Sequence, residues 1–174
     1  YNVPNVLDQY GKPKTGNENF ASVNLSPDDN HFNPFSYVTT LNGAKPESER
    51  VTGDNGNYSI YNLGIEQIGQ ERAAFILYAS GTTRHEHVNF RNSQTVTVHQ
   101  IVATDAKAYG AIVVSNVDAA YTMNNIHAYD CRVFALQKVG TLGARINGTS
   151  TITNCTVNNC YVEKYLADAK PYDY

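Results

Sequence analysis

Short stretches rich in Val, Ile, Thr and Tyr alternate with Gly, Asn, Asp and Ser along most of the chain, which predicts short strands separated by turns. The pattern repeats, because an asparagine recurs beside residues that can be buried, at Asn62, Asn89, Asn125 and Asn154. A period of roughly 25–35 residues separates them, which is typical of a solenoid of strand-containing coils. No stretch shows helical periodicity with capping residues over the about 10–12 residues that a helix needs.

Three strands are predicted in each coil, and the middle one carries the recurring asparagine. The first strands are expected at 75–80, 111–116 and 142–147, and the third at 95–98, 131–135 and 160–164. The coils are aligned by matching 75–78 with 111–114, and Cys131 with Cys160. Across two coils, the same kind of match aligns Gly81 with Gly148.

These strands predict an all-β fold, a right-handed parallel β-helix of about four coils, because parallel crossovers are right-handed as a rule. Five of the six prolines lie in the first 50 residues, so residues 1–54 are expected to form an irregular N-terminal cap. Residues 55–174 are expected to hold the coils and a C-terminal tail. The tail, 165–174, is expected to fold over the last coil and leave a soluble monomer; the alternative is a piece of a longer solenoid whose last coil is open.

The repeat also predicts which side chains stack. Asn62, Asn89, Asn125 and Asn154 are expected to form one ladder, with about 4.8 Å between neighbouring strands and hydrogen bonds between their amides. The residues that follow them are expected to form one buried row: Leu63, Phe90, Ile126 and Cys155. Ile65 and Val157 are expected to be a further inward pair.

Composition narrows the class of protein. At 174 residues the chain is expected to be a single domain, and its 17% charged content favours an extracellular β-rich surface. A net charge of −3 without a basic stripe argues against nucleic acid as the partner. No apolar run is long enough to span a membrane. Because Tyr1 is not an initiator methionine, we expect a removed signal peptide and an extracellular or cell-surface location.

The three cysteines give no disulfide framework. Cys131 and Cys160 align in adjacent coils, so a bridge between them and a pair of buried free thiols both remain open. Cys155 aligns with apolar residues and is expected in the core.

Two stretches carry a family resemblance. Residues 74–83 followed by 88–93 resemble coils of bacterial right-handed parallel β-helix surface proteins. Residues 139–149 leading into 152–157 are similar to the GLUG-type repeat of those proteins, which reads as a glycine-rich strand, an N-G-T turn and an I-T-N-C strand. The resemblance covers about residues 55–165, and Gly143-Ala144-Arg145 departs from the usual Gly-Leu-Val-Gly run. It implies a Bacteroidetes-like adhesin module from a secreted or surface-anchored protein, and it brings no catalytic residues.

His85 and His87 are the weak candidates for a metal site, because strand alternation places two imidazoles on one face. No third ligand is visible in the sequence, and His87 aligns with Ile60, Met123 and Ile152, which are expected to point inward or toward a coil edge. We therefore expect ordinary hydrogen-bonded histidines, no bound metal and no other cofactor.

Thirteen tyrosines and no tryptophan give the chain an unusual aromatic balance. A tyrosine has an apolar ring and a polar tip, which suits contact with sugars or protein. Tyr121, Tyr129 and Tyr161, together with Arg91, are the candidates for ligand contact, and packing within the strands is the alternative for each ring.

Lyases and hydrolases that act on polysaccharides through a parallel β-helix need clustered carboxylates on one face. The acids are sparse here, since Asp130 aligns with Asn159 and Asp118 with Thr82, and neither makes a pair of acids. The sequence therefore predicts a protein that is not an enzyme, with a polysaccharide-active enzyme, or a fragment of one, as the alternative. The favoured role is structural or adhesive, with strand faces and loops presented to a glycan or to a host or bacterial surface protein. The identity of the ligand stays open.

Overall fold

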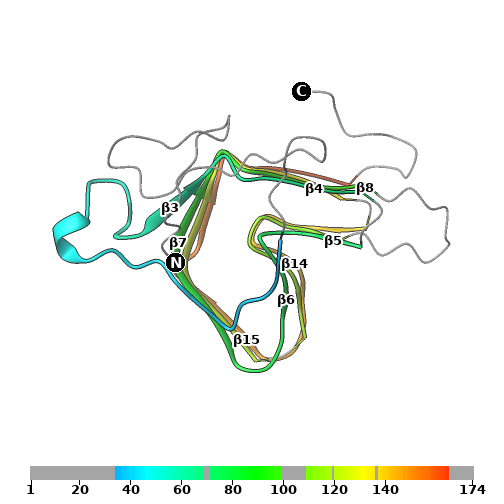
Figure 1. Cartoon of the computed structure of the whole chain (residues 1–174), viewed down its shortest axis with the longest axis horizontal. Helices are drawn as coiled ribbons and strands as arrows, with labels where there is room; N and C mark the ends of the chain where they lie inside the picture. The colour runs from blue at the N-terminus through cyan, green and yellow to red at the C-terminus, as the bar shows by residue number, and fades with distance from the viewer. Residues whose placement is uncertain (1–33, 69–70, 99–108, 119, 136, 165–174) are drawn as a thin grey trace.

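The computed structural model describes residues 34–68, 71–98, 109–118, 120–135 and 137–164. These residues form an all-β structure in which every pairing between strands is parallel. The strands form four sheets, each named below after one of its inner strands. When the molecule is viewed along the direction in which the strands stack, successive strands of each sheet overlie one another (Figure 1).

The β6 sheet has the order β1-β6-β10-β14, formed by Phe35–Tyr37, Ile76–Ala79, Val114–Val117 and Gly143–Ile146. The β8 sheet has the order β17-β12-β8-β4, formed by Tyr161–Lys164, Arg132–Ala135, Gln94–Val98 and Gly64–Ile68. The β9 sheet is narrow, with the order β13-β9-β5 from Lys138–Val139, Tyr109–Gly110 and Arg72–Ala73.

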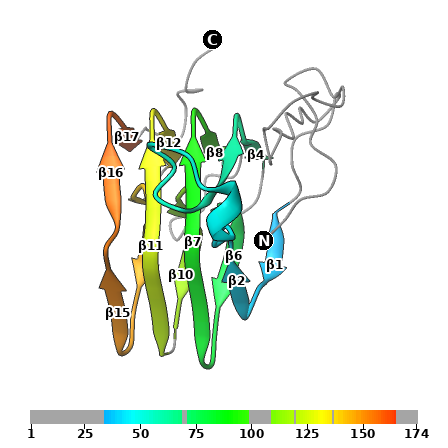
Figure 2. The ribbon, with the colours of Figure 1, turned by 90° about the vertical axis from the view of Figure 1, so that its left-hand side faces the viewer.

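The β7 sheet has the order β15-β11-β7-β2, formed by Ser150–Thr153, Tyr121–Tyr129, Thr83–Arg91 and Thr40–Asn42. Two further strands extend it, since β16 (Thr156–Asn158) pairs with β11 and β3 (Tyr58–Tyr61) pairs with β7. The segment between β2 and β3 contains the short 3-10 helix η1 (Glu47–Glu49). It lies in front of the sheet when the sheet is viewed face on (Figure 2).

Four consecutive segments of the chain supply these strands: 35–68, 72–98, 109–135 and 138–164. Each segment contributes in turn to the β6, β7 and β8 sheets, and the last three segments also contribute to the β9 sheet. Parallel pairing between successive segments fits a β-helix, because each strand is paired with the equivalent strand of the next segment.

The predicted strands lie close to the observed ones. The strands expected at 142–147, 95–98 and 160–164 correspond to β14, β8 and β17. The alignment of Gly81 with Gly148 agrees with the register in which Thr83, Tyr121 and Ser150 are opposite one another. Both glycines have a positive φ, 69° and 79°, in the turns before β7 and β15, where a side chain would be strained.

The N-terminal part of the chain differs from the prediction. Residues 1–54 were expected to be irregular, yet β1 and β2 lie within this range and pair with β6 and β7. Residues 1–33 and 165–174, where caps were predicted, lie outside the residues that the structure describes. Within the described residues, no helix has the length and apolar character needed to cross a membrane.

The predicted ladder of Asn62, Asn89, Asn125 and Asn154 does not form as one column. Asn89 lies opposite Ser59 and His127, so it is aligned with neither Asn62 nor Asn125. Asn125 and Asn154 are equivalent, because the pairs Asn124–Thr153 and His127–Thr156 keep one register around them. Between the second and third segments, Val88 is the partner of Ile126, a place that the predicted alignment gave to Phe90.

In place of that ladder, residues with the left-handed backbone conformation form two separate columns. One follows the corner between the β7 and β8 sheets, with φ between 47° and 54° at Asn62, Asn92, Asp130 and Asn159. Asn92 Nδ2 donates to Asn62 Oδ1 at 2.6 Å, and Asn159 Nδ2 donates to Asp130 Oδ1 at 2.5 Å. Asn and Asp adopt this conformation more readily than other side chains, which explains why they stand at the corner.

The second column runs through the middle of the β7 sheet. His87, Asn125 and Asn154 have φ of 59°, 54° and 54°, and Asn154 separates β15 from β16. The Asn125 amide donates to His87 Nδ1 at 2.8 Å, whereas the Asn154 amide donates to Asn124 Oδ1 at 3.0 Å. Left-handed residues within a strand reverse the in–out alternation, so they shift which side chains reach the core.

The predicted core row is buried in its first three members but does not share one register. Phe90 lies between Ile60 and Ala128, and Leu63 donates its N–H to Ser93 Oγ in the next segment. Leu63, Phe90 and Ile126 are buried, while Cys155 is half-buried against the core. Ile65 is buried as expected, but Val157, the other member of the predicted inward pair, is 48% exposed because it lies in the last segment.

The three cysteines are free thiols. Cys131 and Cys160 are neighbours in adjacent segments, as the sequence predicted, and they directly precede β12 and β17. The Cys131 N–H points to Cys160 Sγ at 3.4 Å. Burial, chiefly, raises the pKa of Cys131 to about 12, so this thiol is protonated and unreactive near neutral pH.

Candidate functional site

The four residues predicted to contact a ligand lie in three different places. Tyr121 is only 2% exposed, so it cannot contact a ligand. Tyr161 is 51% exposed on β17, beside Phe134. Only Arg91 and Tyr129 come together, with the guanidinium carbon 4.3 Å from the centre of the Tyr129 ring on the β7 sheet.

Arg91 and Tyr129 are already engaged by the segment between β2 and β3. Arg91 Nη2 donates to the Gly53 carbonyl at 3.0 Å, and the Asn55 amide donates to the Tyr129 hydroxyl at 2.9 Å. The Asn89 amide donates to the Asp54 carbonyl at 2.8 Å. These contacts hold residues 43–57 against the outer face of the β7 sheet, so the pair has a structural role here.

Asp54 organises this segment. Its carboxylate is 3.0 Å from Lys45 Nζ, and it accepts N–H bonds from Val51 and Gly56. Burial acts to raise the pKa of Asp54, but the two N–H groups and the Lys45 ammonium together hold it below its ordinary value. The ion pair therefore persists at neutral pH.

His85 faces the core, and both ring nitrogens are occupied by protein groups. Nε2 lies 2.6 Å from the Val38 carbonyl, which requires the proton on Nε2, and Nδ1 then accepts from the Tyr121 hydroxyl at 3.0 Å. His85 is aligned with Met123, and His87 lies in the left-handed conformation, so the two imidazoles do not share a face as predicted. No group of three or more His, Cys, Asp or Glu side chains is gathered for a metal in the part of the chain that the structure describes.

We expect the buried His85 to make the protein less stable in mild acid. Burial lowers the pKa of His85 below 6.5, although its bond to the Val38 carbonyl opposes this. The unfolded chain then binds a proton before the folded one does, so stability is complete above pH 6.5 and falls as the pH is lowered. Urea titrations between about pH 7 and about pH 5 should show this fall, above the range in which carboxylates titrate.

The His85→Gln variant is the control for this pH dependence. Its unfolding free energy should change less with pH than that of the wild type. Burial also lowers the pKa of His127, with help from Arg91, so part of the dependence should remain. A slope equal to that of the wild type would exclude His85 as a source.

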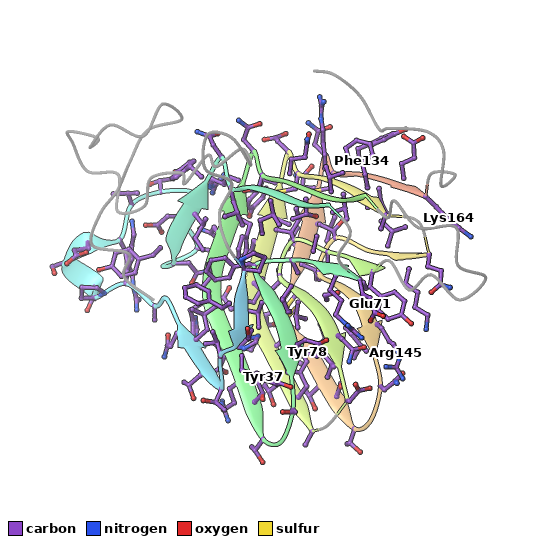
Figure 3. All side chains as sticks on the ribbon, turned by 45° about the vertical axis from the view of Figure 1, so that its right-hand side comes forward. Tyr37, Glu71, Tyr78, Phe134, Arg145 and Lys164 are labelled. Atoms are coloured by element: carbon purple, nitrogen blue, oxygen red, sulfur yellow. The ribbon has the colours of Figure 1, made fainter. Side chains whose placement is uncertain are left out.

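A second cluster lies on the outer faces of the β6 and β9 sheets, and we call it the aromatic–cationic surface. Its members are Tyr37, Arg72, Tyr78, Tyr109, Lys138 and Arg145. The β5 and β6 strands meet at a bend, so the outer faces of the two sheets turn toward each other (Figure 1). The labelled Tyr37, Tyr78, Glu71 and Arg145 lie along one side of the molecule, away from Phe134 (Figure 3).

Strand register builds this surface as two adjacent rows. In the β6 sheet, Tyr37 is opposite Tyr78, Tyr78 is opposite Asn116, and Asn116 is opposite Arg145. The second row lies in the β9 sheet, where Tyr109 stands between Arg72 and Lys138. Each row crosses the strands at right angles and takes one side chain from each successive strand.

The aromatic rings and cations contact one another across the bend. The Tyr37 and Tyr78 rings are stacked with their centres 5.4 Å apart. The Arg72 guanidinium carbon lies 4.6 Å from the centre of Tyr78 and 5.6 Å from that of Tyr109. Lys138 Nζ is 5.3 Å from the Tyr109 ring. Tyr109 is buried beneath these cations, whereas Tyr37 remains 60% exposed.

Arg145 ends the row of the β6 sheet in a polar network. Its Nη1 is 3.0 Å from Asn116 Oδ1 and 3.1 Å from Asp118 Oδ1. The Asn147 amide donates to the same Asp118 oxygen at 3.2 Å, and the Asn116 amide also bonds to this carboxylate. The network fixes the direction of the Arg145 side chain, which is part-exposed.

Arg72 is held at the bend by Glu71, whose carboxylate lies 2.8 Å from Arg72 Nη1. Its Nε is buried and has no hydrogen-bond partner among the described residues. On the inner side, the β9 sheet approaches β12 so closely that a Cβ on Gly110 would lie 2.9 Å from the Ala135 Cβ. This packing keeps the short β9 sheet in place beneath Arg72.

None of the six members of the aromatic–cationic surface was predicted from the sequence as a site residue. The predicted alignment matched Ile76 with Ile112, whereas the structure pairs Ile76 with Val114 and thereby places Tyr78 beside Asn116. The strands of the β9 sheet are two residues long and carry no periodic pattern that a sequence can show.

Comparisons with known proteins do not assign the chain to a family, because no family model, no curated protein and no solved structure matches it. The resemblance to GLUG-type surface proteins therefore stays a prediction.

Proposed function

We propose that this chain is a right-handed parallel β-helix module with an adhesive role, which binds an extended glycan through the aromatic–cationic surface. The observation that carries the proposal is the row formed by Tyr37, Tyr78, Asn116 and Arg145, one residue from each of four adjacent strands. A row with this direction suits a chain-like ligand that crosses the strands and contacts Tyr37, Tyr78 and Arg145, while the buried Asn116 supports Arg145 from below.

The chemistry of the row favours a sugar. Tyrosine offers an apolar face with a polar tip, and Tyr37 presents the most exposed ring of the surface. Arg145 brings a planar guanidinium whose position is fixed by Asp118 and by the buried Asn116. Fixed polar groups beside aromatic rings are the usual composition of sites that orient a small number of ligand hydroxyls.

The charges of the surface favour a glycan over nucleic acid. Arg72 is paired with Glu71, and Arg145 is paired with Asp118, so two of its three cations are largely compensated. Nucleic-acid affinity depends on several uncompensated cations that contact phosphates. Lys138 remains as the exposed cation, which allows a ligand of low negative charge.

The predicted extracellular setting supports the same proposal. The resemblance of residues 139–157 to GLUG-type repeats of bacterial surface proteins and the low charged content, 17%, both agree with a secreted or cell-surface module. The proposed partner is then an extended extracellular polysaccharide.

Affinity electrophoresis with soluble polysaccharides tests the proposal. The probes are polygalacturonate, xylan and a β-glucan, each embedded in a native gel. At least one should retard the wild type, and Tyr78→Ala should weaken that binding by at least about tenfold, as for truncation of an aromatic anchor.

Tyr161→Ala is the matched control, because Tyr161 is also an exposed tyrosine but lies on β17 of the β8 sheet. It should bind as the wild type does. Equal weakening by Tyr161→Ala, or no retardation of the wild type by any probe, would refute the proposed site. Product formation from polygalacturonate would move the assignment to a polysaccharide lyase or hydrolase.

A further inference from the structure

Three asparagines of the chain are followed directly by glycine: Asn42, Asn55 and Asn147. In such a pair the backbone nitrogen of the glycine can attack the side-chain amide carbon of the asparagine, because no Cβ on the glycine hinders the approach. The attack needs a glycine N–H that can give up its proton, so a glycine N–H held in a hydrogen bond protects its pair. The three pairs differ in this respect.

Two of the pairs are protected by the hydrogen bonds of their glycines. The Gly43 N–H donates to the Glu86 carbonyl at 3.1 Å, as part of the pairing with β7, and Gly43 is buried. The Gly56 N–H donates to Asp54 Oδ1 at 2.7 Å. Attack at either pair would first have to break one of these bonds.

The third pair lies in the exposed turn between β14 and β15. Within the described part of the chain, the Gly148 N–H donates to no group, and the φ of Gly148 is 79°. Gly81 occupies the equivalent turn inside the stack, with a segment on either side, and its N–H also meets no acceptor among the described residues. The free N–H is therefore a property of this turn and does not result from the position of the last segment.

Asn147 adjoins the aromatic–cationic surface. Its amide donates to Asp118 Oδ1 at 3.2 Å, and the same oxygen lies 3.1 Å from Arg145 Nη1. A carboxylate at position 147 could not donate this bond and would repel the Asp118 carboxylate. Arg145 would then face two acids instead of one, so less of its charge would be available to a ligand.

We propose that Asn147 deamidates spontaneously and that this modification weakens ligand binding at Arg145. The Gly148 nitrogen bonds to Asn147 Cγ, the bond from Cγ to Nδ2 breaks, and the amide nitrogen leaves as ammonia with the Gly148 proton. Water then opens the five-membered imide at either carbonyl, which restores an N–H and leaves aspartate or isoaspartate at position 147. The net change exchanges ammonia for water, so no oxidant is needed. The modification is independent of the proposed glycan site, whereas its effect on binding rests on that proposed function.

Peptide mapping by mass spectrometry tests the modification on the full chain after incubation at mildly alkaline pH. The peptide that contains Asn147 should gain the mass difference between an amide and an acid, and chromatography should resolve aspartate from isoaspartate. Its conversion should be at least about fivefold faster than that of Asn42 or Asn55, the factor that one lost N–H hydrogen bond represents. In urea the three rates should become similar, because the protecting bonds are gone.

Asn147→Gln is the matched variant, because glutamine keeps an amide that can donate to Asp118, whereas its longer side chain forms a ring far more slowly. Residue 147 should then stay unmodified under the same conditions. Conversion of Asn147 in the folded wild type at or below the rates of Asn42 and Asn55 would overturn the proposed modification.

Asn147→Asp tests the consequence for binding in native gels with embedded polysaccharide. Retardation should weaken by about two- to fivefold relative to the wild type and to Asn147→Gln, the range for one exposed ion pair. Unchanged binding by Asn147→Asp would refute the effect at Arg145 and leave the glycan site standing. No retardation of the wild type by any probe would refute the glycan site and this effect together, while the peptide map still decides the modification.

Discussion

Phe90→Ala should lower the free energy of unfolding by about 3–5 kcal/mol, the cost of truncating a large aromatic side chain in a core. Phe90 is fully buried in β7, and its ring meets the Phe75 ring edge to face at 5.5 Å. Ile60 and Ala128 lie on the strands to either side of it, so they cannot close the cavity without moving two sheet strands. Urea titration of the two proteins measures the difference.

Val157→Ala is the control for this loss, because Val157 stands in the same column as Phe90 and Ala128. It is 48% exposed, so its truncation should cost below about 1 kcal/mol in the monomer. A loss for Phe90→Ala as small as that for Val157→Ala would show that the inside of the stack is not where the structure places it.

Asn125→Ala should have the next largest effect on stability, a loss of about 2–5 kcal/mol. Asn125 has a φ of 54°, a conformation that costs about 1–2 kcal/mol for most side chains. Its amide also donates to Asn57 Oδ1 at 3.0 Å, and its Oδ1 accepts from His127 Nε2 at 2.7 Å. Removing these buried partners adds about 1–3 kcal/mol.

Asn125→Gly separates the two contributions. Glycine adopts a positive φ without strain, so this variant should lose the hydrogen bonds and keep the backbone conformation. Its loss in the same urea titration should be clearly smaller than that of Asn125→Ala. If Asn125→Gly loses as much unfolding free energy as Asn125→Ala, the left-handed conformation of Asn125 contributes nothing to the stability of the β7 sheet.

The strands themselves could be predicted because their composition is local. Val, Ile, Thr and Tyr between turn residues located β14, β8 and β17 within a residue or two. β1 and β2 were missed because proline-rich surroundings hid them: each is three residues long, too short for alternation to be seen. β1 and β2 become strands through their parallel pairing with β6 and β7, which their own sequences do not reveal.

Register was harder to predict, for a reason that lies in strand geometry. Ile112 and Val114 are two positions apart in the sequence, so in a regular strand either partner for Ile76 keeps the same side chains inside and outside. The hydrophobic pattern therefore could not distinguish the two alignments. The left-handed residues at His87 and Asn125 also shift the alternation within a strand, which hid the displacement of Asn89.

The candidate site could not be found from the sequence because it depends on that register. Arg72 and Tyr78 are close in sequence, but their contact requires the bend between β5 and β6. Tyr37 reaches Tyr78 only because β1 joins the β6 sheet. Conversely, Tyr121 looked like a surface tyrosine, whereas burial and its hydrogen bond to His85 assign it to the core.

Nuclear magnetic resonance of the tyrosine rings tests the proposed glycan site most directly, since the chain has 13 tyrosines and no tryptophan. The protein is labelled on tyrosine, assigned through single Tyr→Phe variants, and titrated with the polysaccharide that retards it in the gel. We predict that the Tyr37 and Tyr78 signals move together and saturate, while those of Tyr129 and Tyr161 stay in place. Shifts at Tyr129 or Tyr161 with unchanged Tyr37 and Tyr78 would contradict the proposal.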